Sequence, residues 1–182
     1  MGGDSGDGEV SLVGALPSHV PPFDGFTVEM AEHLLPEHAR FELHGGRIVV
    51  MSPARVWHTE AQRRIANLLI RQGRIGRIEV GLAIAPGETR VLDVAAFVDE
   101  PDEDSAYFQP GEIELAVEVV SPSSRDDDYI DKPALYARLG IAEFWRADRD
   151  GSGTVHVAQF RLDPDRRVYV PAGVVPLDEL DG

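Results

Sequence analysis

The sequence predicts an α/β or α+β domain in which helices flank a mixed central β-sheet. Short apolar runs of strand length alternate with segments whose apolar residues recur at helical spacing. Two glycine-containing turns separate neighbouring strand-like runs and predict hairpins. A strand, a helix and another strand follow one another over 113–148, the order of a crossover between parallel strands. Hairpins and a crossover in one chain predict a mixed sheet.

The first part of the chain predicts a tail, a short helix and a hairpin. Residues 1–25 are rich in glycine, proline and acids and are expected to be a disordered or extended tail before a single domain over 26–182. Thr27 is expected to cap a helix over about 28–35, which ends at Pro36. The turn His44-Gly45-Gly46 then joins two short strands.

A longer amphipathic helix is predicted from near Trp57 to Gln72. Its apolar residues fall at positions i, i+4, i+7 and i+8, and Gly73 ends it. Beyond it, a second hairpin turns at Pro86-Gly87-Glu88, and 99–112 is acidic and loop-like. The remaining predicted elements are a buried strand over 113–120, a helix to about Leu139 closed by Gly140, and short strands over 143–148, 154–162 and 167–170.

Composition limits the function classes. The 182 residues contain 32 Asp+Glu against 17 Lys+Arg, a formal net charge of −15, and no cysteine. The absence of cysteine excludes disulfides, thiolate zinc sites and a cysteine nucleophile. No apolar run is long enough to span a membrane and the N-terminus lacks signal-peptide features, so a soluble cytoplasmic protein is expected. The acidic balance argues against a protein that coats DNA, although local contact or contact through a metal remains open.

Two carboxylates stand alone in otherwise apolar strands. Asp93 lies in VLDVAAFV and Glu118 in LAVEVV. A buried carboxylate is costly unless it is paired or binds a metal. If the strands are neighbours, about 4.8 Å apart, the two acids can share a hard divalent ion such as Mg²⁺. The alternative is a pair of buried acids held by arginine or by backbone N–H groups.

Lys132 is the only lysine of the chain, since the other sixteen basic residues are arginine. It follows Glu118 by 14 residues, near the start of a helix predicted to pack beside that strand end. An ammonium there can hold an attacking water or stabilise a phosphate. The alternative is an ordinary solvated lysine.

An ordered series of segments resembles the Uma-type restriction endonuclease family, a branch of the PD-(D/E)XK nuclease superfamily. ELAVEVVSPSSR resembles its DLVVEVLSPSTR signature and is followed by matches to K…YA..GV.EYW. The matched positions are Phe41-Glu42-Leu43 with Gly46, Met51-Ser52-Pro53 with His58, Asp93-Val94-Ala95, Glu114–Arg125, Lys132, Tyr136, Gly140-Ile141 and Glu143-Phe144-Trp145. The resemblance covers roughly residues 25–177.

The resemblance implies a restriction-endonuclease-like fold and a metal-dependent endonuclease. It implies that Asp93 and Glu118, with the Val119 carbonyl, hold Mg²⁺ or Mn²⁺, and that Lys132 orients the water. Glu42 is expected to reach the metal directly or through water. His58 is expected to assist proton transfer or contact phosphate, or else to be a helix-capping or satisfied core histidine.

Two positions depart from the family pattern. Leu92 replaces a proline that carries no ligand, and Val120 stands where the superfamily lysine is usual, a role that passes to Lys132. Pro133 fits only the first turn of a helix, so the helix is expected to begin near Asp131 or Lys132.

Six arginines between Arg55 and Arg77 form the basic stretch of an acidic chain. Arg63, Arg64 and Arg71 share the polar face of the predicted helix and are expected to contact nucleic-acid phosphates. DNA is the expected substrate. The alternative is a solvated arginine face. Superfamily analogy suggests a homodimer. The rival functions are a catalytically inactive binding or regulatory protein with the nuclease fold, and a metal-dependent hydrolase of another phosphorylated substrate.

Overall fold

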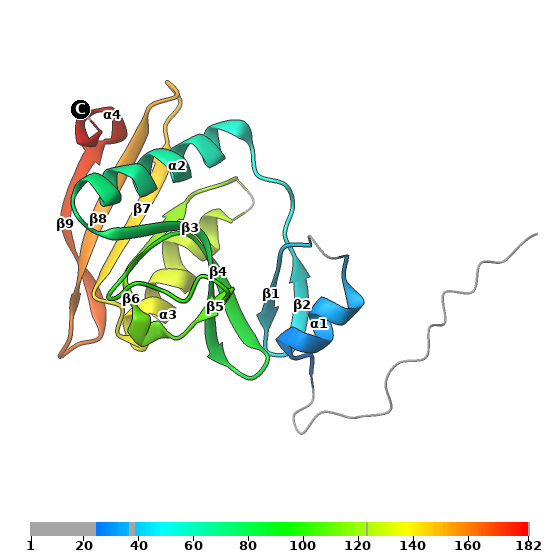
Figure 1. Ribbon diagram of the computed structural model, residues 1–182. Coiled ribbons are helices and arrows are strands. Elements are labelled where there is room, and N and C mark those ends of the chain that lie inside the picture. The colour runs from blue at the N-terminus through cyan, green and yellow to red at the C-terminus, as the bar shows by residue number, and fades with distance from the viewer. Residues whose placement is uncertain (1–24, 37–38, 123, 182) are drawn as a thin grey trace, which may run out of the picture.

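The computed structural model describes residues 25–36, 39–122 and 124–181 (Figure 1). A seven-stranded sheet has the order β5-β3-β4-β6-β7-β8-β9, and β1 and β2 form a separate two-stranded sheet. The helices are α1 (Val28–Leu34), α2 (Val56–Arg71), α3 (Lys132–Leu139) and α4 (Leu177–Leu180). The strands are β1 (Phe41–His44), β2 (Arg47–Val50), β3 (Ile75–Ala85), β4 (Glu88–Phe97), β5 (Tyr107–Phe108), β6 (Ile113–Val119), β7 (Glu143–Arg149), β8 (Val155–Asp163) and β9 (Val168–Pro176).

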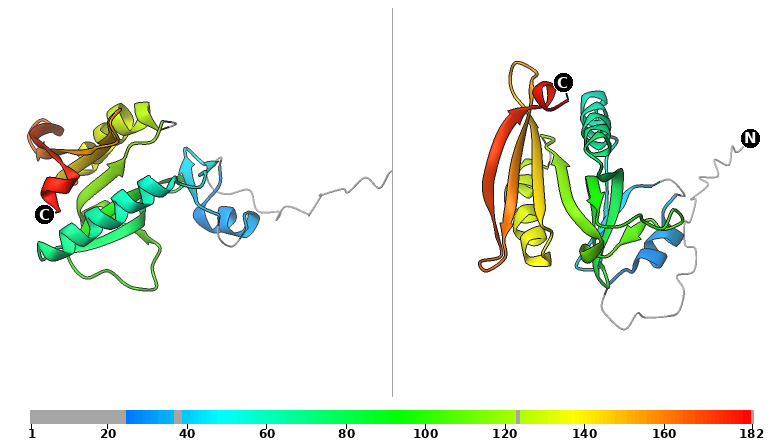
Figure 2. Two further views of the ribbon diagram at one scale, coloured as in Figure 1. Left: turned by 90° about the horizontal axis from the view of Figure 1, so that it is seen from above. Right: turned by 60° about the vertical axis from the view of Figure 1, so that its left-hand side comes forward.

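The large sheet is mixed, as the sequence predicts. Strand β4 pairs antiparallel with both β3 and β6, whereas β6 and β7 run parallel and are connected through α3. Helices α2 and α3 cover opposite faces of the sheet (Figure 2). Strands β4 and β6 are therefore neighbours that are covered on both faces, which explains their almost uninterrupted apolar sequences.

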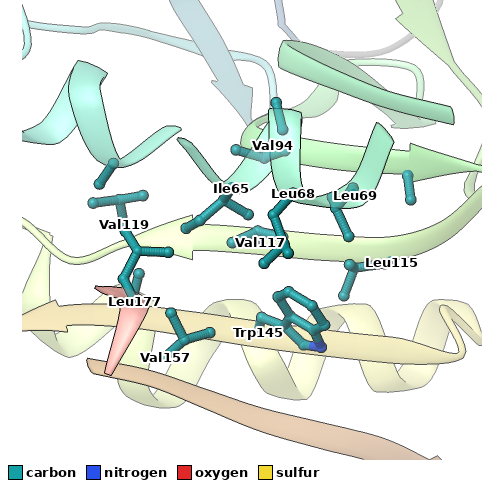
Figure 3. Packing of buried hydrophobic residues seen from close by; sticks show 14 residues of the cluster. Ile65, Leu68, Leu69, Val94, Leu115, Val117, Val119, Trp145, Val157 and Leu177 are labelled. Atoms are coloured by element: carbon teal, nitrogen blue, oxygen red, sulfur yellow. The ribbon is translucent and has the colours of Figure 1, made fainter. Parts of the chain in front are cut away.

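The α2 face of the sheet holds the larger apolar core (Figure 3). Ile65 and Leu69 of α2 are fully buried and belong to the same core cluster as Val94 of β4, Val117 of β6 and Trp145 of β7. Each buried aliphatic side chain of this kind contributes about 1.5–3 kcal/mol. This packing fixes α2, and hence the residues at its N-terminus, against the centre of the sheet.

The opposite face packs against α3. Tyr136 of α3 is fully buried and belongs to a cluster that includes Leu92 of β4, Ala116 of β6 and Phe144 of β7. The Tyr136 and Phe144 rings lie 6.0 Å apart. Because α3 carries both Lys132 and Tyr136, this packing also sets their positions beneath β6.

The β1–β2 hairpin docks on the start of β4, beside α1 (Figure 1). Gly45 and Gly46 have φ values of +57° and +76°, a conformation for which glycine has no steric penalty. The Gly46 N–H donates to the Gly87 carbonyl at 2.7 Å, and the Leu43 N–H donates to the Thr89 hydroxyl at 2.9 Å. Both predicted hairpins are thus present, and one is fastened to the other.

Most predicted elements are confirmed, and the structure differs from the prediction in one loop and in the length of the last strand. Thr27 caps α1 through a 3.3 Å hydrogen bond from the Met30 N–H, and Gly140 ends α3 with φ +84°. The loop expected over 99–112 contains the short strand β5, and β9 continues beyond Pro171 to Pro176. Proline is tolerated there because β9 is an edge strand. The tail expected over 1–25 lies, except for its last residue, outside the described residues.

A π-helical turn over Asp127–Asp131 leads into α3. The Lys132 N–H bonds back to the Asp127 carbonyl, five residues earlier, and Pro133 follows in the first turn of α3. The expected helix start near Lys132 is confirmed, but the chain is already helical before it. Among the described residues, no helix is long and apolar enough to cross a membrane.

Candidate active site

Asp93 stands where β4 and β6 separate. The pairing of the two strands runs from Phe97 opposite Ile113 to Val94 opposite Val117. One residue further along, the Asp93 carboxylate accepts a hydrogen bond from the Val119 N–H at 2.7 Å, so a side chain replaces the backbone acceptor. Its other oxygen accepts from the Gln62 side-chain amide of α2 at 2.8 Å. The strands that carry Asp93 and Glu118 are therefore adjacent, as expected.

Glu118 is fully buried on the α3 side of β6 and is satisfied by two donors. Lys132 Nζ donates to one carboxylate oxygen at 2.8 Å, and the Tyr136 hydroxyl donates to the other at 2.6 Å. Burial raises the pKa of Glu118 well above its usual value, against the effect of the ammonium. Burial also raises the pKa of Tyr136, which keeps its hydroxyl protonated as a donor.

Lys132 bridges two buried carboxylates. Its ammonium lies 2.9 Å from Asp128 as well as 2.8 Å from Glu118, and each of these acids is about 1% exposed. Burial alone would lower the pKa of Lys132, but the two carboxylates outweigh it and hold the pKa well above the usual value. Burial raises the pKa of Asp128 too, although Lys132 and Ser124 oppose that shift. The lysine is therefore a buried, ion-paired cation rather than a solvated surface residue.

The π-helical turn brings Asp128 under Lys132. The two residues are four apart, a spacing that places side chains on one face of a helix. Asp128 is fixed in turn by the Ser124 hydroxyl at 2.5 Å and by its own N–H, which donates to the Ser124 carbonyl. π-Helical turns of this kind are frequent at functional sites.

His58 lies in the first turn of α2 and reaches across to β6. Its Nε2 lies 2.8 Å from the Val119 carbonyl oxygen and 3.4 Å from the Asp93 carboxylate. Since a carbonyl only accepts, Nε2 carries the proton. Burial lowers the pKa of His58, but the hydrogen bond and charge of Asp93 outweigh that effect, and the net pKa is raised. Nδ1 is buried without a hydrogen-bond partner in the described part of the chain.

These groups meet at a cavity of about 560 Å³. Asp93, His58, Val119, Asp128 and Lys132 line it, together with residues 49–55 at the end of β2 and beyond it. Glu118 does not line it, because Lys132 and Tyr136 occupy its carboxylate from the other side of the strand. From the predicted site, the cavity is therefore lined by Asp93, His58, Val119 and Lys132.

Glu42 is placed in the hairpin rather than on the cavity wall. It is buried, accepts a hydrogen bond from the Val91 N–H at 2.9 Å and pairs with His44 at 2.7 Å. These contacts fasten β1 to β4, just before Asp93. Its expected approach to a metal stays a prediction.

The oxygen donors at the cavity fit a hard divalent ion. Asp93 and the Val119 carbonyl offer oxygen ligands, and each carboxylate oxygen has more than one lone pair. No group of three acidic, histidine or cysteine side chains in the described residues is arranged to hold a metal. Mg²⁺ commonly binds one or two carboxylates and completes its shell with water and substrate phosphate, so this donor set is compatible with it. Ligation by Glu118 would require Lys132 to release one oxygen.

The three arginines expected to contact phosphate are all paired with acids. Arg63 pairs with Glu60 one turn earlier, and Arg64 and Arg71 both pair with Asp181 near the C-terminus. Arg64 also contacts Asp178. Their charges are therefore largely neutralised on the outer side of α2, and their role in binding stays a prediction.

The structure adds two residues to those singled out from the sequence. Gln62 is fully buried beside Asp93, four residues after His58 on the same helix face. The helical periodicity of the sequence places this glutamine among the apolar, buried positions of α2, and that placement could have identified it as a candidate. Asp128 is one of several acids at 126–131, and its spacing of four residues from Lys132 is the signal that distinguishes it from its neighbours.

Comparison with known proteins agrees with this fold. The chain shares its fold with a putative nuclease belonging to DUF820 from Anabaena variabilis ATCC 29413, with 16% sequence identity, a TM-score of 0.57 and coverage of 83% of each chain. No curated protein matches the sequence. The model of the Uma2 family, described as "Putative restriction endonuclease", matches residues 28–181. The chain, with its seven-stranded mixed sheet flanked by helices, belongs to this Uma2 family of nuclease-fold proteins.

Proposed function

We propose that the protein hydrolyses phosphodiester bonds of nucleic acid with the help of a divalent metal ion. The observation that carries the proposal is the convergence of the Asp93 carboxylate, the Val119 carbonyl and the Lys132 ammonium on one cavity. Family membership and the nuclease fold support the same class of reaction. DNA as the preferred substrate, a homodimer and a cytoplasmic location remain predictions of this proposal.

Asp93 and the Val119 carbonyl would hold Mg²⁺ or Mn²⁺, with Glu118 as a further ligand if Lys132 yields one oxygen. When bound, such an ion polarises the phosphoryl oxygens and lowers the pKa of a bound water. Gln62 and the Val119 N–H orient the Asp93 carboxylate from two sides. Partners of this kind fix the direction in which a ligand presents its free lone pairs.

Lys132 would orient the attacking water and stabilise charge that develops on the phosphate. Its ammonium stays protonated because Glu118 and Asp128 raise its pKa. Both acids are buried, so they hold the ammonium in one place instead of leaving it to sample rotamers. His58, with its Nδ1 without a protein partner, would contact phosphate or take part in proton transfer.

The test is cleavage of labelled DNA and RNA with Mg²⁺ or Mn²⁺ by the wild type and by Asp93→Asn. Asparagine has nearly the same shape, so loss of a negative ligand is the main change. We expect a fall in rate of about a hundred-fold or more, in line with the removal of a metal ligand or a main electrostatic group. Arg166→Ala, an exposed residue in the β8–β9 turn, is the matched control. Equal rates for wild type and Asp93→Asn, or no cleavage by the wild type, would refute the proposal.

The hydrogen bonds to both carboxylate oxygens of Glu118 favour a second candidate function. With both its oxygens engaged by Lys132 and Tyr136, the chain fits a nuclease-fold protein that binds or regulates without catalysis. Calorimetric titration with Mn²⁺ distinguishes the two. Metal binding that Asp93→Asn abolishes supports the nuclease, whereas absence of metal binding together with unchanged stability of the variant supports the non-catalytic protein.

A further inference from the structure

A second cavity, of about 600 Å³, adjoins the candidate catalytic cavity. The two share Arg55, Trp57, Ser121 and Pro122 in their walls. The second cavity extends from these residues to the end of β7 and the β7–β8 turn over 150–154. The two cavities therefore adjoin along these four shared residues.

Arginines surround this second cavity. Arg55 and Arg149 are exposed, and neither forms an ion pair with another described residue. The Nε of Arg149 donates to the Gly153 carbonyl at 3.1 Å, which leaves its positive charge without a carboxylate partner. Arg125, also exposed, pairs with Asp148 at 3.2 Å. Two uncompensated guanidinium groups thus face one cavity of a strongly acidic protein.

The acids of this cavity are already engaged. Asp148 accepts from the Tyr129 hydroxyl at 2.6 Å besides its pairing with Arg125. Asp150 caps the β7–β8 turn, where Ser152 and Thr154 donate to one of its oxygens and His156 contacts the other. These hydrogen bonds lower the pKa of Asp150, the largest effects coming from Ser152 and His156. Asp148 is thus paired with Arg125, and Asp150 is an ionised carboxylate held in place by the β7–β8 turn, whereas Arg55 and Arg149 have no carboxylate partner among the described residues.

Trp57 joins the two cavities. Its ring is half-buried, lies edge-on to His58 with centroids 5.8 Å apart, and has the Arg149 guanidinium 5.5 Å from its centroid. The guanidinium lies over this ring, and the ring also packs against the core on the α2 face, so an unpaired base that stacks on Trp57 does so together with Arg149. Such stacking tolerates any base. Its position between His58 and Arg149 places this surface directly next to the candidate catalytic groups.

We propose that the second cavity binds the single-stranded segment of nucleic acid next to the bond that lies in the catalytic cavity. Arg55 and Arg149 contact its phosphates, and one base stacks on Trp57. The inference rests on the proposed function for its substrate class. It assigns contact to the sheet end that carries Asp93, instead of the outer face of α2, where the arginines are paired with Glu60, Asp178 and Asp181.

The test is fluorescence anisotropy of a labelled single-stranded oligonucleotide in excess EDTA, where no metal-dependent cleavage occurs. Arg55→Ala and Arg149→Ala are each expected to weaken binding about three- to ten-fold at low salt and to reduce the slope of log K against log salt by about 0.7. Trp57→Ala is expected to weaken binding about ten-fold. Arg166→Ala, at the opposite end of β8, is the matched control and is expected to bind like the wild type. Thermal melting of each variant checks that it is folded.

Three results would overturn the inference: no binding by the wild type, unchanged binding by the Arg55/Arg149 double variant, or weakening by an Arg63/Arg71 double variant instead. A fourth is tighter binding of the matching duplex than of the single strand. Cleavage distinguishes this inference from the proposed function. Arginine-dependent binding without cleavage in Mg²⁺ or Mn²⁺ refutes only the nuclease, whereas cleavage that is insensitive to Arg55 and Arg149 refutes only the second cavity's role.

Discussion

Replacing Lys132 with methionine removes the cation that pairs with two buried acids. Methionine keeps most of the aliphatic volume, so the principal change is the loss of charge beside Glu118 and Asp128. Both carboxylates are about 1% exposed and have the ammonium within 2.9 Å. Breaking a buried ion pair by removing one partner costs about 3–5 kcal/mol, because the remaining charge is left in a poorly solvating environment.

This cost is expected to depend on pH. The orphaned carboxyls can become neutral by binding protons, and their folded-state pKa values then lie above those of the unfolded chain. A raised carboxyl pKa makes folding more favourable as pH falls, so the defect of Lys132→Met should shrink as the pH is lowered from neutral towards the ordinary carboxyl range. A second replacement, Glu118→Gln, removes one of the two orphaned charges and should recover part of the stability at neutral pH.

Urea denaturation in excess EDTA measures these effects without a contribution from bound metal. We expect a loss of about 3–5 kcal/mol for Lys132→Met at neutral pH, equivalent to a fall in Tm of roughly 6–20 °C for a chain of this size. Arg166→Met is the surface control and should stay within about 0.5 kcal/mol of the wild type. A cost for Lys132→Met below about 1 kcal/mol, or one that grows as pH falls, would refute the buried ion pairing of Lys132 with Glu118 and Asp128.

Three further predictions concern the groups around Asp93 and Glu118. Gln62→Leu removes the amide that orients Asp93 and should weaken Mn²⁺ binding about ten- to a hundred-fold by calorimetry; unchanged affinity would show that the amide does not position the ligand. Tyr136→Phe leaves one Glu118 oxygen without its donor and should cost about 1–3 kcal/mol in urea denaturation, and a neutral result would contradict the hydrogen bond. His58 has a raised folded pKa, so its stabilising contribution is complete below the unfolded value near 6.5 and is lost as pH rises through the folded pKa. In EDTA the stability gap between wild type and His58→Gln should therefore narrow with rising pH, and a widening gap would contradict the assignment.

The elements of the fold follow closely from local signals. Thr27, the glycines of the two hairpins and Gly140 each act through their own backbone or a neighbouring N–H, and the structure confirms them. The apolar patterns around Asp93 and Glu118 also predict correctly that both strands are central. Such features depend on a few consecutive residues, which is why the sequence reveals them.

The arrangement of charges depends on contacts that are distant in the sequence. Asp181 pairs with Arg71 across 110 residues, and nothing near Arg71 indicates that its charge is compensated. Asp128 precedes Lys132 by four residues, a spacing visible in the sequence, but only the packing of the folded chain buries this pair against Glu118. Glu118 faces α3 while Asp93 reaches towards α2, so the two acids are neighbours in the sheet without sharing one cavity wall.

The Asp93 side chain serves as a clasp between two diverging strands. Because its carboxylate accepts the Val119 N–H where no backbone carbonyl does, folding alone would select for an oxygen acceptor at this position. A lineage that had abandoned hydrolysis would still be expected to keep it, and an alanine variant would lose strand pairing together with any ligand. Asparagine retains one oxygen for Val119, and Gln62 can rotate its amide to accept from the new NH₂ group. Asp93→Asn therefore distinguishes the structural role of Asp93, which joins the two strands, from its proposed role as a metal ligand.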